Sequence, residues 1–264
     1  MSEQILKQAI VRPPAPNFAD GLTTSPHLGA PQFELALAQH AAYCKALSRC
    51  GVTVTTLEPD PTLPDSTFVE DTAVLADRCA VITRPGAPSR RAEVESIRNE
   101  IANFYPNVFS IQEPGTLDGG DVCRAGDHFF IGMSERTNET GAQQLAGLFS
   151  LFGYSSSFID IRGIDGLLHL KSGLAYLDNH RLLVASALEQ KFAEIADDDY
   201  EIIPVVSDEQ YAANCLYING YVLLASGYPN TAQTLESYGY NLLVLEMTEF
   251  QKMDGGLSCL SLRF

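Results

Sequence analysis

Two segments of the sequence share the pattern DGGxxC, in which a cysteine follows an aspartate and a glycine pair. They run from Asp118 to Cys123 and from Asp254 to Cys259. A cysteine thiolate is a strong nucleophile, and glycines beside it permit a positive φ or a close backbone approach. Each cysteine is therefore a candidate nucleophile, although burial as a small apolar residue is the alternative for both. Asp118 can equally be read as a cap of its glycine turn.

Other residues could supply acid–base chemistry and charge. His169, in LLHLKS, stands where a strand is expected to begin, and Glu70 and Asp71, in FVEDT, stand at a similar position. Arg90 and Arg136 would serve a site whose ligand carries an anionic group. Each has a plain structural alternative, namely a hydrogen-bonded histidine, a solvated acidic turn and surface arginines. Together these residue types indicate nucleophilic and acid–base chemistry, but they do not name a substrate.

A repeated order of elements indicates how these residues are brought together. Strand, tight turn, strand, helix and strand recur four times, with turns near residues 78, 127, 179 and 219. The strongest turn signal is Asn219–Gly220. The expected strands and helices are 72–76, 79–83, a helix from 91 and 108–111; 122–124, 128–131, a helix over 142–152 and 158–161; 173–177, 182–185, a helix over 188–195 and 202–206; 215–218, 221–224, a helix over 231–238 and 242–245.

A fifth unit is split between the two ends of the chain. Residues 258–262 predict its first strand, and residues 5–11, 33–47 and 52–57 predict its other strands and its helix. Pairing of the terminal strands would close a five-bladed α/β propeller from a single domain, residues 1–264, and would remove an exposed sheet edge. It would also hold Cys259 rigid, although the residue lies only five positions from the C-terminus, where chains usually fray.

The first strands of the five units should all begin on the same side of the ring. Their entries read FVEDT, LDGGDV, HLKS, YAANC and MDGGLSC. This arrangement predicts one cavity surrounded by the polar residues of these entries, which are Glu70, Asp71, Asp118, Asp121, His169, Ser172, Asn214, Asp254 and Cys259.

Composition narrows the class of protein. The formal net charge is −16 and the sequence shows no large basic cluster, which argues against a nucleic-acid partner. No apolar run approaches the roughly 20 residues that cross a bilayer, and no secretion signal is visible, so the expected location is the cytoplasm. The six cysteines form no C-x-x-C pair, so neither a zinc ribbon nor a disulfide framework is expected.

Seven segments carry a resemblance to a known family: LPDSTFVEDTAV, ITRPGAPSRR, LDGGDV, SERTNETGA, LHLKSGLAYL, YAANCLYIN and KMDGGLSCLSLRF. In order and spacing they resemble the dimethylarginine dimethylaminohydrolases (dimethylargininases) of the guanidine-modifying superfamily, over essentially the whole chain. The resemblance implies the five-bladed pentein propeller and hydrolysis of Nω-methylated arginines to citrulline and dimethylamine or methylamine. It also implies a small cationic amino-acid substrate, with no metal and no organic cofactor.

The resemblance assigns roles that the repeat alone leaves open. Cys259, rather than Cys123, matches the nucleophile, His169 the general acid/base and Asp118 the carboxylate that orients the histidine. Some relatives carry glutamate where this chain has Asp118, so the reach of that carboxylate differs slightly. Asp71 and Glu70 match residues that hold the guanidinium, with Asp65 and Phe68 beside them; Arg90 and Arg136 match those that hold the α-carboxylate; Leu22 matches a mobile lid; and Ser172, Met253 and Asp254 match pocket or supporting positions.

Proteins of the same fold supply the alternatives. An arginine deiminase usually has an extra helical insertion, for which the units leave no room. An agmatine deiminase would have no α-carboxylate for Arg90 and Arg136 to hold. A non-catalytic binding protein of this fold would not need Cys259, His169 and the acidic entries together. The sequence leaves a homodimer open.

Overall fold

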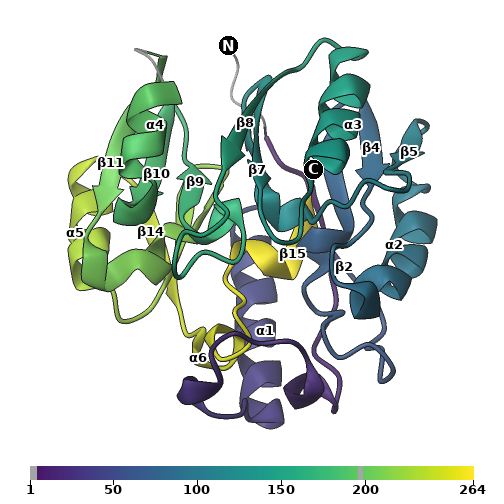
Figure 1. The fold of residues 1–264 in the computed structure, drawn as a ribbon. Coiled ribbons are helices and arrows are strands. Elements are labelled where there is room, and N and C mark those ends of the chain that lie inside the picture. Colours follow the sequence, from purple (N-terminus) through teal and green to yellow (C-terminus); the bar gives the residue numbers. More distant parts are fainter. Residues whose placement is uncertain (1–4, 196–198) are drawn as a thin grey trace.

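Five three-stranded sheets form the framework among the residues that the computed structural model describes, 5–195 and 199–264 (Figure 1). In each sheet the central strand pairs antiparallel with one neighbour and parallel with the other. The sheets are β15-β1-β2 (Ser261–Arg263, Gln8–Val11, Thr53–Thr56), β3-β4-β5 (Ala73–Ala76, Cys79–Ile82, Val108–Ser110), β6-β7-β8 (Val122–Ala125, His128–Met133, Ser155–Asp160), β9-β10-β11 (Leu174–Tyr176, Arg181–Ala185, Glu201–Val205) and β12-β13-β14 (Leu216–Ile218, Tyr221–Ala225, Asn241–Leu245).

In four of the five sheets a tight turn joins the antiparallel strands, where the sequence predicts it. In the turn between β12 and β13, Asn219 has φ 48° and Gly220 has φ 88°, and Ile218 pairs with Tyr221. Two successive residues in the left-handed region suit the right-handed twist of a two-residue hairpin, which explains the Asn-Gly sequence.

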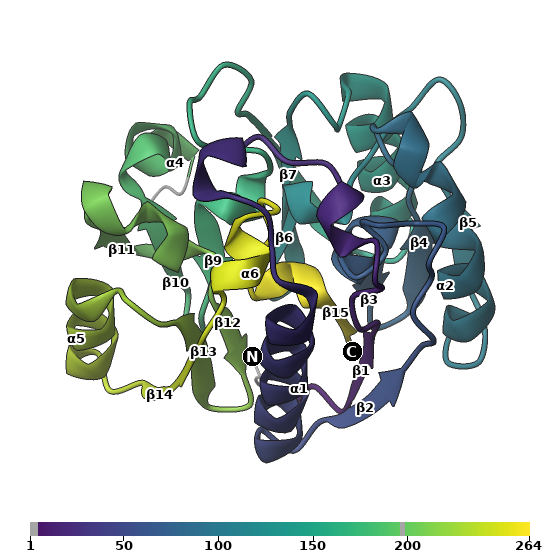
Figure 2. The same cartoon turned by 90° about the horizontal axis from the view of Figure 1, so that it is seen from below.

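A helix carries the chain from the second to the third strand of each sheet, since a parallel pair needs a crossover. These helices are α1 (Phe33–Arg49), α2 (Val94–Ile101), α3 (Glu139–Ser150), α4 (Glu189–Ile195) and α5 (Pro229–Ser237), and they lie at the outside of the molecule (Figures 1 and 2). The predicted apolar faces are confirmed for Leu145 and Phe149 in α3 and for Ile97 and Ile101 in α2, all of which are buried. Phe104 was predicted on the α2 face but lies beyond the helix and is 39% exposed.

The predicted pairing of the chain ends is confirmed. β1 and β15 pair antiparallel, with Ile10 opposite Leu262, and the amide of Lys7 donates to the carbonyl of Phe264 at 2.9 Å. The Phe264 ring packs against Tyr105, with centroids 5.4 Å apart. Figure 2 shows β1 beside the C-terminus. The tail is therefore an ordered part of the fifth sheet.

A short 3₁₀ turn precedes the first strand of each sheet. The five turns are Val69–Thr72, Gly119–Asp121, Leu170–Ser172, Ser207–Ala213 and Ser258–Leu260. The strand predicted over 258–262 is therefore too long, and Cys259 lies in a turn instead. Side chains explain the difference, because Asn214 accepts the amide of Ser258 and Glu70 accepts its hydroxyl, in bonds that are not part of a sheet.

The described residues also contain an α-helix outside the predicted repeat. The short helix α6 (Thr248–Gln251) lies between β14 and the turn that carries Cys259. In the described residues, no helix combines the length and the apolar character that crossing a bilayer needs.

Candidate active site

The nucleophile candidate Cys259 is the middle residue of its 3₁₀ turn and is 9% exposed. Its sulfur accepts the backbone amide of Gly256 at 3.4 Å and lies 3.9 Å from Nδ2 of Asn214. Burial raises the pKa of the thiol to about 12, and the charges of Glu70 and Asp71 act in the same direction. Cys259 is therefore a neutral thiol at neutral pH.

The glycine pair before Cys259 makes room for two side chains. A Cβ on Gly255 would overlap the ring of Phe68, and a Cβ on Gly256 would overlap the amide of Asn214. The pattern DGGLSC is thus explained by close packing on both sides of the turn.

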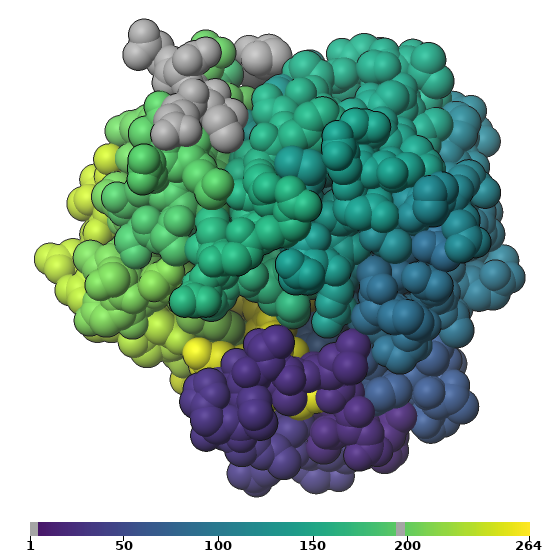
Figure 3. All heavy atoms as spheres, in the orientation of Figure 1, coloured from purple at the N-terminus to yellow at the C-terminus, as the bar shows by residue number. Residues whose placement is uncertain are grey.

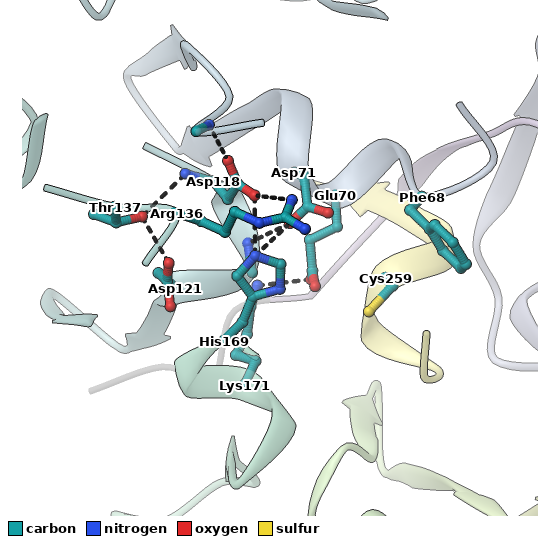
Figure 4. A network of polar contacts seen from close by, with 12 residues as sticks. Phe68, Glu70, Asp71, Asp118, Asp121, Arg136, Thr137, His169, Lys171 and Cys259 are labelled. Carbon is teal, nitrogen blue, oxygen red and sulfur yellow. Dashed lines mark hydrogen bonds and ion pairs between the residues drawn. The ribbon is translucent and has the colours of Figure 1, made fainter. Parts of the chain in front are cut away.

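His169 and Asp118 form a buried pair beside this turn (Figure 4). Nε2 of His169 lies 3.0 Å from Oδ2 of Asp118 and 4.0 Å from Oδ1 of Asp71. Burial lowers the pKa of His169, but Asp71, Asp121 and the bond to Asp118 outweigh it and raise the pKa to about 9. At neutral pH the imidazole is therefore protonated and able to donate.

Asp118 is oriented from both sides. Its Oδ1 accepts the amide of Gly86 at 2.8 Å, and its Oδ2 faces His169 and also Nη1 of Arg136 at 3.6 Å. The amide of Asp118 donates to the hydroxyl of Thr137 at 3.1 Å. Burial raises the pKa of Asp118, but the bond to His169 and the nearby cations overcome this and keep it below its ordinary value.

Asp121 links these residues from behind, although sequence reasoning placed it only at the cavity and gave it no role. Its Oδ2 accepts the hydroxyls of Ser134 and Thr137, both at 2.6 Å, and its Oδ1 accepts the amide of Leu170 at 2.9 Å. Burial raises its pKa to about 6. Asp121 thus ties the segment of Arg136 to the residue that follows His169. Its position in the LDGGDV entry was the signal in the sequence that could have pointed to this role.

Asp71 and Arg90 form a second buried pair. Nη1 of Arg90 lies 2.5 Å from Oδ2 of Asp71, and Nη2 lies 2.8 Å from Oε2 of Glu93. Oδ1 of Asp71 accepts the amide of Gly120 at 2.9 Å. Nη2 of Arg90 also donates to the carbonyls of Asp65 and Phe68 at 3.3 and 3.1 Å. These bonds fix both charged groups at the wall of one pocket.

Glu70 faces away from that pocket. Its Oε2 accepts the hydroxyl of Ser258 at 2.7 Å, and its Oε1 lies 2.7 Å from Nζ of Lys171 and 2.9 Å from Nη2 of Arg263. The prediction that Glu70 holds the guanidinium beside Asp71 therefore needs correction. Successive residues of a 3₁₀ turn point about 120° apart, so these neighbours face different cavities.

The pocket that contains Cys259 and His169 is small, with a volume of about 20 Å³. It brings together ten of the predicted site residues and adds Leu168 and Gly255. Asp118 and Ser172 do not line it, but both contact His169. The hydroxyl of Ser172 accepts the amide of His169 at 3.3 Å. The lining residues are Leu22, Asp65, Phe68, Asp71, Arg90, Arg136, Leu168, His169, Met253, Asp254, Gly255 and Cys259.

An N-terminal segment covers the pocket. The amide of Leu22 donates to Oδ1 of Asp65 at 3.0 Å, the amide of Thr24 donates to Asp254, and the hydroxyl of Thr23 donates to the carbonyl of Lys252 at 2.8 Å. In Figure 3 only small yellow areas of the C-terminal region show between this purple segment and the teal middle part of the chain. The Leu22 side chain is 42% exposed.

The rival cysteine, Cys123, lies elsewhere. It lines a larger cavity of about 460 Å³ along the first strands of the sheets, whose lining includes neither His169 nor Cys259. Burial raises the pKa of its thiol to about 11. The larger cavity therefore lacks the chemistry that the smaller pocket gathers.

The groups nearest His169 are poorly suited to bind a metal ion. Ligand atoms of Asp71, Asp118 and His169 lie within 4.8 Å of one another. However, Asp71 is paired with Arg90 and Asp118 contacts Arg136, so two guanidinium groups already neutralise these carboxylates.

Comparisons with known proteins place the chain in a family. Residues 30–259 match the family model described as "N,N dimethylarginine dimethylhydrolase, eukaryotic". The N(G),N(G)-dimethylarginine dimethylaminohydrolase of Pseudomonas aeruginosa is 45% identical over 98% of this chain and 100% of its own length. The protein of the same name from Streptomyces coelicolor is 35% identical over 97% of this chain and 96% of its own length.

Comparisons with solved structures support the same family and the same fold. A cysteine-to-serine mutant of the P. aeruginosa enzyme complexed with citrulline matches with a TM-score of 0.93 and 44% identity, over 99% of this chain and 100% of that one. The N-terminal domain of ArgZ, a cyanobacterial arginine dihydrolase, matches with a TM-score of 0.84 at 18% identity, over 98% of this chain and 97% of that one, which supports the fold alone. The five-bladed α/β architecture expected from the repeat is thereby confirmed, and the chain belongs to the dimethylarginine dimethylaminohydrolase family.

Proposed function

We propose that this protein hydrolyses Nω-methylated arginines to citrulline and dimethylamine or methylamine. The observation that carries the proposal is the meeting of a cysteine, a protonated histidine and acidic side chains in one small pocket, in a chain that is 45% identical to a dimethylarginine dimethylaminohydrolase. The citrulline bound to the mutant P. aeruginosa enzyme corresponds to the product named here.

Asp71 and Asp65 bind the substrate guanidinium, since both line the pocket and charge-assisted bonds fix the plane of a guanidinium for attack. Arg136 binds the α-carboxylate. The bonds of Arg90 involve Nε, Nη2 and one hydrogen of Nη1, so its other Nη1 hydrogen can share that carboxylate. Phe68, Met253 and Asp254 shape the pocket, and Leu22 closes it.

Substrate binding activates the nucleophile. The negative charges of Glu70 and Asp71 disfavour a thiolate at Cys259, and the arriving guanidinium offsets them. The thiol proton passes to water, and the thiolate attacks the central guanidino carbon to form a tetrahedral adduct.

His169 handles the remaining protons. Its imidazolium donates to the departing amine, which cannot leave as an anion, and a thiouronium on Cys259 remains. Water then attacks that carbon and gives a proton to the neutral imidazole. Collapse breaks the C–S bond and expels the thiolate, the hydroxyl proton of the adduct passes to water to give citrulline, and the thiolate then takes up a proton to restore the thiol. Asp118 keeps the imidazole aligned through both steps, and these steps require no metal or organic cofactor.

The test offers the pure protein dimethylarginine, monomethylarginine, arginine and agmatine separately, and measures citrulline or carbamoylputrescine. We expect citrulline from the methylated arginines, and none from the Cys259→Ser variant, which should remain folded. A clear preference for agmatine or plain arginine would replace this proposal with a deiminase, and no turnover of any of them would leave a binding protein.

We also propose that residues 1–264 act as one domain in the cytoplasm. All six cysteines are free, which suits a reducing compartment. The homodimer stays a prediction, which analytical ultracentrifugation tests.

A further inference from the structure

The side-chain amide of Asn214 contacts both Ser258 and Cys259, although it was not among the residues expected to act in the site. Asn214 follows the 3₁₀ turn Ser207–Ala213 and is 6% exposed. Its Oδ1 accepts the amide of Ser258 at 2.9 Å, and its Nδ2 lies 3.9 Å from the sulfur of Cys259.

The orientation of this amide is fixed by chemistry. A backbone N–H can only donate, so the oxygen of Asn214 must face Ser258 and the NH₂ group must face the sulfur. A Cβ on Gly256 would overlap the amide, so the glycine permits this close approach.

The sulfur has a second hydrogen-bond donor. The amide of Gly256 points at it from 3.4 Å. The Ser258 hydroxyl is 4.0 Å away, but it donates its proton to Glu70. Negative charges on Glu70 and Asp71 oppose ionisation of the thiol. The charge of Lys171 favours a thiolate, and the two N–H groups are the donors that point at the sulfur itself.

We propose that Asn214 is a further catalytic residue, whose Nδ2–H group acts with the backbone N–H of Gly256 as a donor pair for the Cys259 thiolate. The pair stabilises the sulfur when it loses its proton before attack. The same pair stabilises the sulfur again when hydrolysis of the thiouronium expels it as a thiolate, and this second role rests on the proposed function.

The first test needs no substrate. The rate of alkylation of Cys259 by iodoacetamide is followed against pH, with peptide mapping to separate this cysteine from the other five. A hydrogen bond to a charged group contributes about 1.5–3 kcal/mol, so Asn214→Ala should lower the rate at neutral pH about 10- to 100-fold and move the profile to higher pH.

Asn214→Asp sharpens the test. Its carboxyl keeps an oxygen for the amide of Ser258, so it preserves the turn if the alanine variant fails to fold. When protonated it can donate to the sulfur, and when ionised it cannot. We therefore expect the reactivity of Cys259 in Asn214→Asp to approach that of the wild type, and to exceed that in Asn214→Ala, only below the pKa of the new carboxyl. A merely structural role would not produce this crossover.

Asn138→Asp is the matched control. Asn138 caps α3 through its Oδ1, which accepts the amide of Gly141 at 2.8 Å. Aspartate keeps that bond, gives up the bond of Nδ2 to the carbonyl of Pro114, and adds the same charge at an exposed position that does not line the pocket. Alkylation profiles of both Asn214 variants that coincide with the control would overturn the inference. If the wild type does not hydrolyse dimethylarginine but the profiles shift as expected, the proposed function fails and the donor pair stands.

Discussion

Replacing Asp118 with asparagine should disable His169 while leaving the shape of the pocket intact. Oδ1 of Asp118 accepts the amide of Gly86, and Oδ2 faces Nε2 of His169 at 3.0 Å. In Asp118→Asn the amide oxygen must stay on Gly86, because that backbone N–H can only donate. The new NH₂ group then faces Nε2, which can accept its proton only as a neutral imidazole.

The size of the effect follows from the ionisation of His169. Its pKa of about 9 leaves about 99% of the imidazole protonated at pH 7, whereas the ordinary value of about 6.5 would leave about a quarter. The loss of protonation alone therefore lowers kcat only about fourfold. The wrong tautomer matters more, and a comparable change in serine proteases lowers kcat about 10⁴-fold. We expect kcat to fall by about 10³- to 10⁴-fold with KM little changed.

Two measurements check this reasoning. An NMR titration of the histidine side chains, with His169→Gln to assign the signal, should show the pKa falling from about 9 toward 6.5 or lower. Steady-state hydrolysis of dimethylarginine supplies kcat. An imidazole that still titrates near 9 in Asp118→Asn, or a kcat close to that of the wild type, would refute the assignment of Asp118.

Three further predictions concern stability, closure and the acidic turn. His169 has a pKa of about 9 in the folded protein and about 6.5 in the unfolded chain. It therefore contributes about 3 kcal/mol to the free energy of unfolding below pH 6.5, and this contribution is lost as the pH rises through 9. Urea unfolding should show the loss in the wild type and not in His169→Gln. In Gly21→Ala the new Cβ would lie 2.5 Å from Oδ1 of Asp65, which holds the amide of Leu22, so KM should rise while the midpoint of urea unfolding barely changes. Glu70→Gln removes the charge that two cations share and should cost about 3 kcal/mol or more of unfolding free energy, whereas a fall in kcat/KM without loss of stability would show that Glu70 acts on the substrate after all.

Much of the architecture could be predicted because local signals agreed with each other. Strands, turns and helices recur in the same order along the chain. Turn signals such as Asn219–Gly220 and apolar helix faces such as those of Phe149 and Ile97 mark this order. The pairing of the two ends followed because one unit would otherwise have been incomplete. Strand beginnings were less predictable, because side-chain bonds from Asn214 and Glu70 hold Ser258 in a turn.

The direction of individual side chains could not be predicted from spacing. Glu70 and Asp71 are neighbours in one acidic pair, but the turn directs Asp71 into the pocket and Glu70 toward Lys171. Asn214 and Asp121 were placed at the cavity without a role, because their importance depends on which atoms they contact across sheets. Such contacts join residues far apart in the sequence, and a periodic pattern does not contain them.

The central claim is that the sulfur of Cys259 becomes covalently bonded to the guanidino carbon during turnover. Mass spectrometry of protein quenched with acid during hydrolysis of dimethylarginine tests it directly. We predict that the peptide containing Cys259 gains the mass of dimethylarginine less dimethylamine, and that Cys259→Ser gains nothing. Unmodified Cys259 during demonstrable citrulline formation, or the same adduct on Cys123, would contradict the account.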